Sequence, residues 1–111
     1  MTKTMNEWAK ELHENSVNKG FYEGVDMTEF NWQSSKLMLI VSEVSETMEA
    51  LRKSMGSEEV VKEISDTLIR TLDLYEALRE VGVVTESLDE VFEQKAEFNK
   101  TRPHLHGGRL G

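Results

Sequence analysis

Apolar residues recur at helical spacing in two neighbouring stretches of the chain, and this spacing restricts the fold more than any other sequence feature. Steps of four and three residues alternate in the first stretch, at Leu37, Val41, Val44, Met48, Leu51 and Met55. The second stretch nearly repeats these steps at Val61, Ile64, Leu68, Leu72 and Tyr75. Such alternation is typical of helices that pack on other helices. We therefore predict two adjacent helices, packed antiparallel through these residues, with a turn at Gly56.

Two more helices are predicted, one on either side of this pair. The four predicted elements are residues 4–18, closed by Lys19-Gly20; a helix capped by Ser34 or Ser35 that continues to about Ser54; a helix capped by Ser57 that ends near Val81-Gly82; and a helix opened by the capping box of Ser87 and Glu90 that runs to about Lys100. The only proline, Pro103, follows the last of them. The fold class is predicted to be all-α, a four-helix bundle.

The length of 111 residues suits one domain, spanning 1–111, with a single core of modest size. Oligomerisation would help such a domain. The charge is uneven, because residues 95–111 carry four basic residues and one acidic residue, while the whole chain has a net charge of -8. That segment is therefore at +3 and the remainder at -11. An acidic body with a basic tail argues against a nucleic acid polymer as partner and suits a small polyphosphate.

Three features that the sequence lacks bear on the expected location of the protein in the cell. The chain has no cysteine, so disulfides and thiolate zinc sites are excluded. Its first twelve residues are polar and charged, unlike a signal peptide. The longest apolar run, residues 37–41, is far shorter than the roughly 20 residues that a membrane-spanning helix needs. A cytoplasmic protein with no membrane partner is expected.

Two acidic residues spaced three apart occur twice, as Glu43 with Glu46 and as Glu63 with Asp66. Residues three apart are neighbours on a helix face, and both pairs occupy the same phase of their apolar pattern. On facing helices they would collect four carboxylates, which repel one another unless a cation such as Mg²⁺ binds them. A solvated acidic face is the alternative, but two identical pairs on adjacent helices are less readily accidental.

Two other groups have open interpretations. Residues 21–32 are expected to form a loop that holds four of the chain's eight aromatic residues, either as an apolar cover or as a wall that stacks on a nucleobase. Lys95, Asn99 and Arg102 share one face of the last helix, either to hold phosphate oxygens or as a solvated basic helix end. His104 and His106 are expected to be exposed rather than to bind a metal.

The pattern Glu43-x-x-Glu46, a spacer, and Glu63-x-x-Asp66 resembles the MazG-like group of all-α nucleoside triphosphate pyrophosphohydrolases. The surrounding residues 37–43 and 63–70 and the tail from Lys95 to His104 agree with this resemblance. It covers most of the chain from about Lys19 onward. Its motifs are specific for the superfamily rather than for a substrate.

The resemblance implies Mg²⁺-dependent hydrolysis of a ribo- or deoxynucleoside triphosphate between the α and β phosphates, in nucleotide house-cleaning or pool control, by a homodimer or homotetramer. Mn²⁺ is a possible substitute. The metal, which would polarise the phosphoryl oxygens, would be held by Glu43, Glu46, Glu63 and Asp66, one of which would orient or deprotonate water. The implied phosphate-binding residues are Lys95, Asn99, Arg102 and, less securely, Lys36. The implied base-binding residues are Trp8, Phe21, Tyr22, Phe30 and Trp32.

Two alternative functions stay open at this point. A sister branch of the superfamily acts on phosphoribosyl-ATP, for which the same acids would serve. A non-catalytic helical interaction module would carry the acids only as surface, and Mg²⁺ would not affect its stability.

Overall fold

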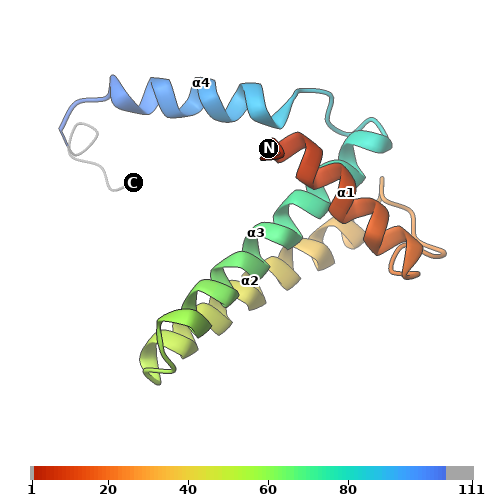
Figure 1. Ribbon diagram of the computed structural model, residues 1–111. Helices are drawn as coiled ribbons and strands as arrows, with labels where there is room; N and C mark the ends of the chain where they lie inside the picture. Colours follow the sequence, from red (N-terminus) through yellow and green to blue (C-terminus); the bar gives the residue numbers. More distant parts are fainter. Residues whose placement is uncertain (1, 105–111) are drawn as a thin grey trace.

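A computed structural model describes residues 2–104, and every regular element within them is a helix. The helices are α1 (Met5–Asn18), α2 (Phe30–Arg52), α3 (Ser57–Glu80) and α4 (Leu88–Lys100). Figure 1 shows α2 and α3 as a long antiparallel pair, with α1 against the C-terminal half of α3 and α4 leading away from the pair. The predicted all-α class is confirmed. The part of the predicted tail that contains His106 and Arg109 lies outside the described residues.

No helix between residues 2 and 104 combines the length and the apolar character that crossing a bilayer requires.

The turn between α2 and α3 differs by two residues from its prediction. Ser54, at φ 52°, occupies the left-handed position after α2 that was predicted for Gly56. The amides of Ser54 and Met55 donate to the carbonyls of Leu51 and Ala50, which is the Schellman pattern of a helix end. Gly56 is instead the N-cap of α3, at φ 102° and ψ 154°, so the predicted cap at Ser57 is wrong by one residue.

Gly56→Ala is expected to lower the free energy of unfolding by about 1–3 kcal/mol, because this backbone region is essentially restricted to glycine. The site has open space for a Cβ, so the effect reports backbone strain and not a steric clash. Gly82 at φ 79° provides the control, since asparagine enters that region readily. Urea unfolding should give a much smaller loss for Gly82→Asn than for Gly56→Asn, and equal losses would contradict the strain argument.

The other helix ends follow their predictions with one exception. The left-handed Gly20 follows the last turn of α1, as predicted, and a capping box of Thr4 and Glu7 that was not predicted begins this helix. At the start of α4, Ser87 accepts a hydrogen bond from the Glu90 amide, which is one of the two hydrogen bonds of the predicted capping box. The exception is α2, which begins at Phe30 after the N-cap Glu29 and not at Ser34 or Ser35. Phe30 and Trp32, predicted to lie in a loop, are therefore in the first turn of α2. An Asp26 side chain that accepts two hydrogen bonds from Thr28 makes the turn that permits this early start.

Small side chains bring α1 close to α3, and Asp73 fastens the two helices together. Ala9 and Ala77 are completely buried. The Asp73 carboxylate accepts hydrogen bonds from His13 Nδ1 at 2.8 Å, Ser16 Oγ at 2.8 Å and Tyr22 hydroxyl at 2.9 Å. It therefore links α3 to α1 and to the segment that follows α1.

The contact between α2 and α3 uses small and polar residues, so the predicted packing face is wrong. The less exposed positions of α2 include a series four and three residues apart, which consists of Lys36, Ile40, Glu43, Thr47 and Ala50. On α3 they include Val60, Glu63, Thr67 and Leu74. The predicted seam faces outward instead: Val44 is 54% exposed, Ile64 46% and Leu68 58%. Both helices are rotated so that the acids meet and the large apolar side chains are left uncovered.

The first turn of α4 is fastened to the first turn of α1. The Asp89 carboxylate accepts hydrogen bonds from the amides of Met5 and Asn6 at 3.0 and 3.3 Å, where the α1 dipole favours a negative charge. The Asn6 side chain in turn accepts from the Asp89 amide at 3.0 Å and donates to Ser87 Oγ at 3.0 Å. Beyond this junction every residue of α4 from Glu90 to Lys100 is exposed.

Candidate metal centre and adjoining cavity

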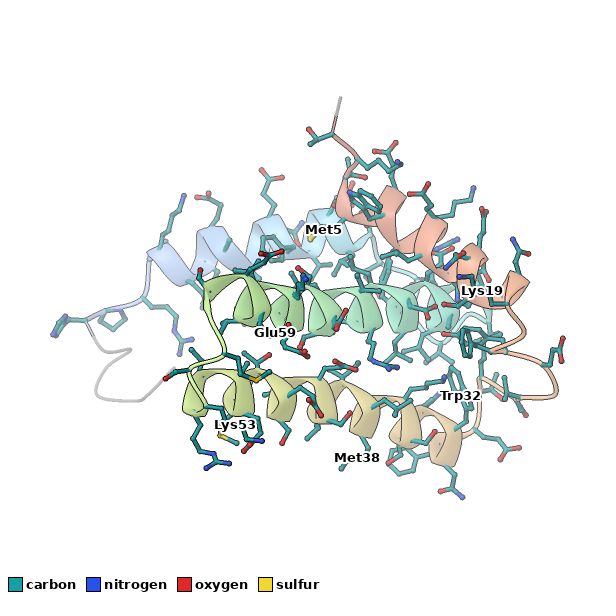
Figure 2. All side chains as sticks on the ribbon, turned by 60° about the horizontal axis from the view of Figure 1, so that its bottom comes forward. Met5, Lys19, Trp32, Met38, Lys53 and Glu59 are labelled. Carbon is teal, nitrogen blue, oxygen red and sulfur yellow. The ribbon has the colours of Figure 1, made fainter. Side chains whose placement is uncertain are left out.

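Three carboxylates converge between α2 and α3. One oxygen from each of Glu43, Glu63 and Asp66 lies within 4.8 Å of the other two. Glu43 comes from the middle of α2, while Glu63 and Asp66 are three residues apart on one face of α3. Figure 2 shows side chains ending in oxygen between these two helices.

The residues around these acids explain how two helices bring like charges together. The hydroxyls of Thr47 and Thr67 donate hydrogen bonds to the backbone carbonyls of Glu43 and Glu63, so neither hydroxyl is an unpaired donor in the contact. Arg70 donates from Nε to Glu43 Oε1 at 2.8 Å, which places one positive charge beside the group. The Glu43 side chain is only 14% exposed, so this ion pair is partly shielded from water.

The surroundings of Glu63 raise the pKa of its carboxyl group. Its partial burial raises its pKa first, followed by the hydrogen bond with Glu59 and the negative charges of Asp66, Glu59 and Glu46. Because the folded-state pKa lies above the ordinary value, folding disfavours the ionised form of Glu63. A bound cation would offset that cost.

The fourth predicted acid lies outside the convergent group. Glu46 is exposed on α2 and reaches the others through its effect on the pKa of Glu63. The structure thus brings together Glu43, Glu63 and Asp66, whereas Glu46 acts at longer range.

The donor set fits a hard divalent cation. All three donors are carboxylate oxygens, the ligand type that Mg²⁺ takes together with water and substrate phosphates. Oxygens around octahedral Mg²⁺ lie about 3.0 Å apart at neighbouring positions and about 4.2 Å at opposite ones, given a metal–oxygen distance of about 2.1 Å. The observed limit of 4.8 Å is slightly wider, and Asp66 is exposed and free to adjust. Glu43, Glu63 and Asp66 are the residues that would hold the ion.

A cavity of about 510 Å³ adjoins the acids. Its volume is within the roughly 300–1,000 Å³ range of small-molecule sites. It is lined by Ser16, Phe21, Lys36, Leu39, Glu43, Asp66, Ile69, Arg70 and Asp73. Cationic, aromatic and carboxylate groups therefore share one space, with two of the three acids at its wall.

Lys36 is the predicted phosphate-binding residue that the structure brings to the cavity. Its Nζ lies 5.2 Å from the centroid of the Tyr22 ring and 5.8 Å from that of Trp32. The ring faces attract the ammonium group and hold it at the cavity wall.

The five predicted base-binding aromatics separate into two groups. Phe21 lines the cavity, and Tyr22 and Trp32 stand behind Lys36 with their ring centroids 5.7 Å apart. Burial, and then the hydrogen bond to Asp73, raise the pKa of Tyr22, so its hydroxyl stays protonated as a donor. The ring of Trp8, on α1, lies under the ammonium group of Lys3, and Phe30 is 74% exposed. Neither Trp8 nor Phe30 lines the cavity.

The three predicted phosphate-binding residues at the end of the chain do not reach the acids within one copy. Lys95 and Asn99 are exposed on α4, Arg102 follows it, and none of them lines the cavity. Lys95 Nζ and the Arg102 guanidinium lie 5.6 and 5.9 Å from the centroid of the Phe98 ring. The helix α4 packs on α1, and the amide of its first residue, Leu88, donates to the Tyr75 hydroxyl of α3 at 3.0 Å.

Arg70 and Asp73 were not among the predicted site residues, although the sequence carries a signal for them. Glu63, Asp66, Arg70 and Asp73 follow one another at steps of three, four and three residues, which is one face of a helix. The pattern of acid pairs alone ends at Asp66. Extending the same face by two turns would have included both residues.

No protein-family model matches the chain, and no curated protein or solved structure does either. The described residues define an all-α protein of four helices with a three-carboxylate group between α2 and α3.

Proposed function

We propose that this chain is a Mg²⁺-dependent nucleoside triphosphate pyrophosphohydrolase. The reaction takes one water and one nucleoside triphosphate and yields the monophosphate and pyrophosphate. The observation that carries the proposal is the convergence of Glu43, Glu63 and Asp66 beside a cavity of about 510 Å³, whose wall includes two of these acids together with a lysine and an arginine. Carboxylates that hold a cation, beside cations that hold phosphates, suit a substrate that is a polyphosphate.

The metal, Lys36 and Glu63 have distinct roles in this reaction. The metal, when bound, supplies Lewis-acid stabilisation of the charge that develops on phosphoryl oxygens. Lys36 attracts the triphosphate, and the rings behind it keep its ammonium group oriented. Glu63, whose pKa is raised, is the acid best suited to accept a proton from water when it is not fully engaged by metal.

The aromatic side of the cavity suits the nucleoside. Phe21 is 65% exposed and lines the cavity, so its ring face is available for stacking on a base. Ser16 and Asp73 line the same space and are already hydrogen bonded to each other, which fixes the shape of this wall. The function is proposed to be house-cleaning or pool control of nucleotides.

The test is product analysis for a panel of ribo- and deoxynucleoside triphosphates, each with and without Mg²⁺. We expect metal-dependent release of pyrophosphate together with the monophosphate, separated by chromatography from any diphosphate. Mg²⁺ alone should also raise the melting temperature, because it binds the folded acids and not the unfolded chain. Mn²⁺ should replace Mg²⁺ in both measurements.

The opposite results identify the alternatives. No release from any nucleotide and no thermal shift with Mg²⁺ would contradict the proposal and favour an interaction module. A thermal shift without turnover would retain the metal site but redirect the search to phosphoribosyl-ATP or a modified nucleotide.

A further inference from the structure

One wall of the cavity beside the acids is built around the carboxylate of Asp73. Ser16 of α1 and Asp73 of α3 both line this cavity, and Ser16 Oγ donates a hydrogen bond to Asp73 Oδ2 at 2.8 Å. The Asp73 side chain is 19% exposed, and Ser16 is partly buried. Two oxygens from different helices are therefore held close together at this wall.

The other oxygen of this carboxylate is occupied by residues that do not line the cavity. Asp73 Oδ1 accepts hydrogen bonds from His13 Nδ1 at 2.8 Å and from the Tyr22 hydroxyl at 2.9 Å. The pKa of Tyr22 is raised, by burial first and then by Asp73, so its hydroxyl stays protonated and donates. A carboxylate oxygen has about two lone-pair positions, so Oδ1 is full, whereas Oδ2 has one position left beside its bond from Ser16.

Both polar atoms at this wall consequently act as acceptors toward a ligand. The Ser16 hydroxyl directs its single proton to Asp73, so only its lone pairs remain available. Asp73 adds one free lone pair on Oδ2, and a carboxylate has no proton to donate. A carbonyl oxygen placed at this wall would be left without a partner, which is unfavourable, whereas an amino group would be paired by both oxygens.

The wall is separated from the acids by the length of the cavity. Asp66 and Asp73 both line it and lie seven residues apart on α3, which corresponds to about 10 Å along the helix axis. Phe21 borders the Asp73 end, because it precedes Tyr22, whose hydroxyl is bonded to Asp73, and its ring is 65% exposed. A nucleotide with its phosphates at the acids therefore has its base directed toward Phe21, Ser16 and Asp73.

We propose that Asp73 and Ser16 select nucleotides whose base carries an exocyclic amino group, as cytosine and adenine do. This inference rests on the proposed function and names the substrate class of the same site. The amino group donates one hydrogen to Asp73 Oδ2 and the other to Ser16 Oγ, while the base stacks on Phe21. Uracil and hypoxanthine present a carbonyl oxygen instead, which two acceptors reject. Acidic side chains recognise the amino group of cytosine in DNA by the same pairing.

Two pairs of nucleotides, dCTP with dUTP and dATP with dITP, test this selection. Within each pair the exocyclic amino group is exchanged for a carbonyl oxygen. The kcat/KM for pyrophosphate release in Mg²⁺ should favour the amino member of each hydrolysed pair by at least about 30-fold, because a site built to hydrogen-bond a donor strongly rejects the analogue that lacks it. A smaller preference, or the reverse one, would overturn the inference and leave the proposed function standing.

Asp73→Asn should reverse the hydrogen-bonding character of the wall. With the amide oxygen bonded to His13 and Tyr22, the amide nitrogen replaces Oδ2 and donates to Ser16, whose hydroxyl proton is then free for a ligand. The wall now offers donors, so the ratio of kcat/KM for dCTP over dUTP should fall by at least about 30-fold. A smaller change in this ratio, as expected if Asp73 only supports the fold and both rates fall together, would overturn the inference. Circular dichroism would verify that the variant stays helical.

Ser16→Ala and Tyr22→Phe separate base selection from stability. Each removes one hydrogen bond to Asp73, but only Ser16 lines the cavity. Ser16→Ala deletes one of the two acceptors, so the dCTP to dUTP ratio should fall by at least about fivefold. Tyr22→Phe should leave the ratio within about twofold of wild type, whatever its effect on the separate rates. A ratio that changes equally in both variants would contradict the assignment of the wall.

A binding measurement distinguishes this inference from the proposed function. Calorimetric titration in Mg²⁺ would use the α,β-imido analogues of dCTP and dUTP, which resist hydrolysis between the α and β phosphates. The Kd should be at least about tenfold lower for the dCTP analogue, because only its base pairs with both acceptors. This preference, without turnover of any triphosphate, would overturn the proposed function and retain the base selection. Equal affinities would overturn the base selection whether or not turnover occurs, and no binding of either analogue would overturn both.

Discussion

Glu63→Gln is expected to lower turnover by at least about 1,000-fold, equivalent to roughly 4 kcal/mol of transition-state stabilisation. The amide keeps the shape of the side chain but cannot provide a charged ligand or accept a proton from water. The measurement is pyrophosphate release at saturating Mg²⁺ and nucleotide. Full activity of Glu63→Gln would contradict the metal-site assignment.

Glu63→Gln should also change how the melting temperature depends on Mg²⁺. The pKa of Glu63 is raised in the folded state, so the contribution of this residue to stability is fully present below its unfolded pKa and is lost as the pH rises through the folded value. At neutral pH the ionised side chain is therefore unfavourable without metal. Glu63→Gln should match or exceed the wild-type melting temperature in a chelator and should lose the increase that Mg²⁺ gives to wild type.

Glu58→Gln is the matched control for this experiment. Glu58 lies in the first turn of α3, is largely exposed and is paired with Lys62 at 3.6 Å. The exchange of acid for amide is identical, but the residue is outside the convergent group. Turnover and the response to Mg²⁺ should be unchanged, and a loss in this variant would mean that general acidity of α3, and not the three-carboxylate group, supports the reaction.

Asp73→Ala is expected to lower the free energy of unfolding by about 3–5 kcal/mol, because removal of one partner leaves the others of a buried charged network unsatisfied. His13, whose side chain is 1% exposed, would lose its bond to Asp73. Its other ring nitrogen lies 3.1 Å from Glu80 Oε2 but has no hydrogen bond there, so Glu80 is a poor replacement. Ser16 and Tyr22 would each lose a partner as well.

Two smaller changes calibrate that loss. Ser16→Ala and Tyr22→Phe each remove one hydrogen bond to Asp73 and should each lower the free energy of unfolding by about 1–2 kcal/mol. Urea unfolding should be followed at one fixed protein concentration, because association stabilises the folded state. A loss below about 1 kcal/mol for Asp73→Ala would show that water replaces the carboxylate and that the network is not a structural link.

The sequence was sufficient for the elements and insufficient for their rotation. Periodicity located four helices, and the cap at Ser87 follows from local chemistry that needs no tertiary information. Which face of α2 contacts α3 depends on all the tertiary contacts of both helices and not on the local sequence alone. The apolar face was assigned to the intramolecular contact because it is the larger source of burial, whereas within one copy the contact includes Glu43, Thr47 and Ala50.

The site was predictable to the same degree. The phase of Glu43, Glu63 and Asp66 relative to the apolar pattern placed them on one side, and the structure brings their oxygens together. Ser16, which shapes the cavity wall, could not be found from the acidic pattern because its role depends on the approach of α1. The relation of Lys95 to the acids could not be found either, since spacing along α4 does not encode the direction in which α4 leaves the body.

Because the Asp89–Asn6 junction lies at the start of α4, a rotation there displaces the far end of the helix. Its 13 residues extend about 20 Å at 1.5 Å per residue, so a rotation of 10° at the junction moves the far end by about 3.5 Å. A displacement of that size exceeds the length of a hydrogen bond. The hydrogen bonds of Asn6, Ser87, Asp89 and Tyr75 at the start of α4 thus contribute to the position of Arg102, although Asn6 and Asp89 lie 83 residues apart in sequence. Small changes at the start of α1 would be magnified at the distant end of the helix.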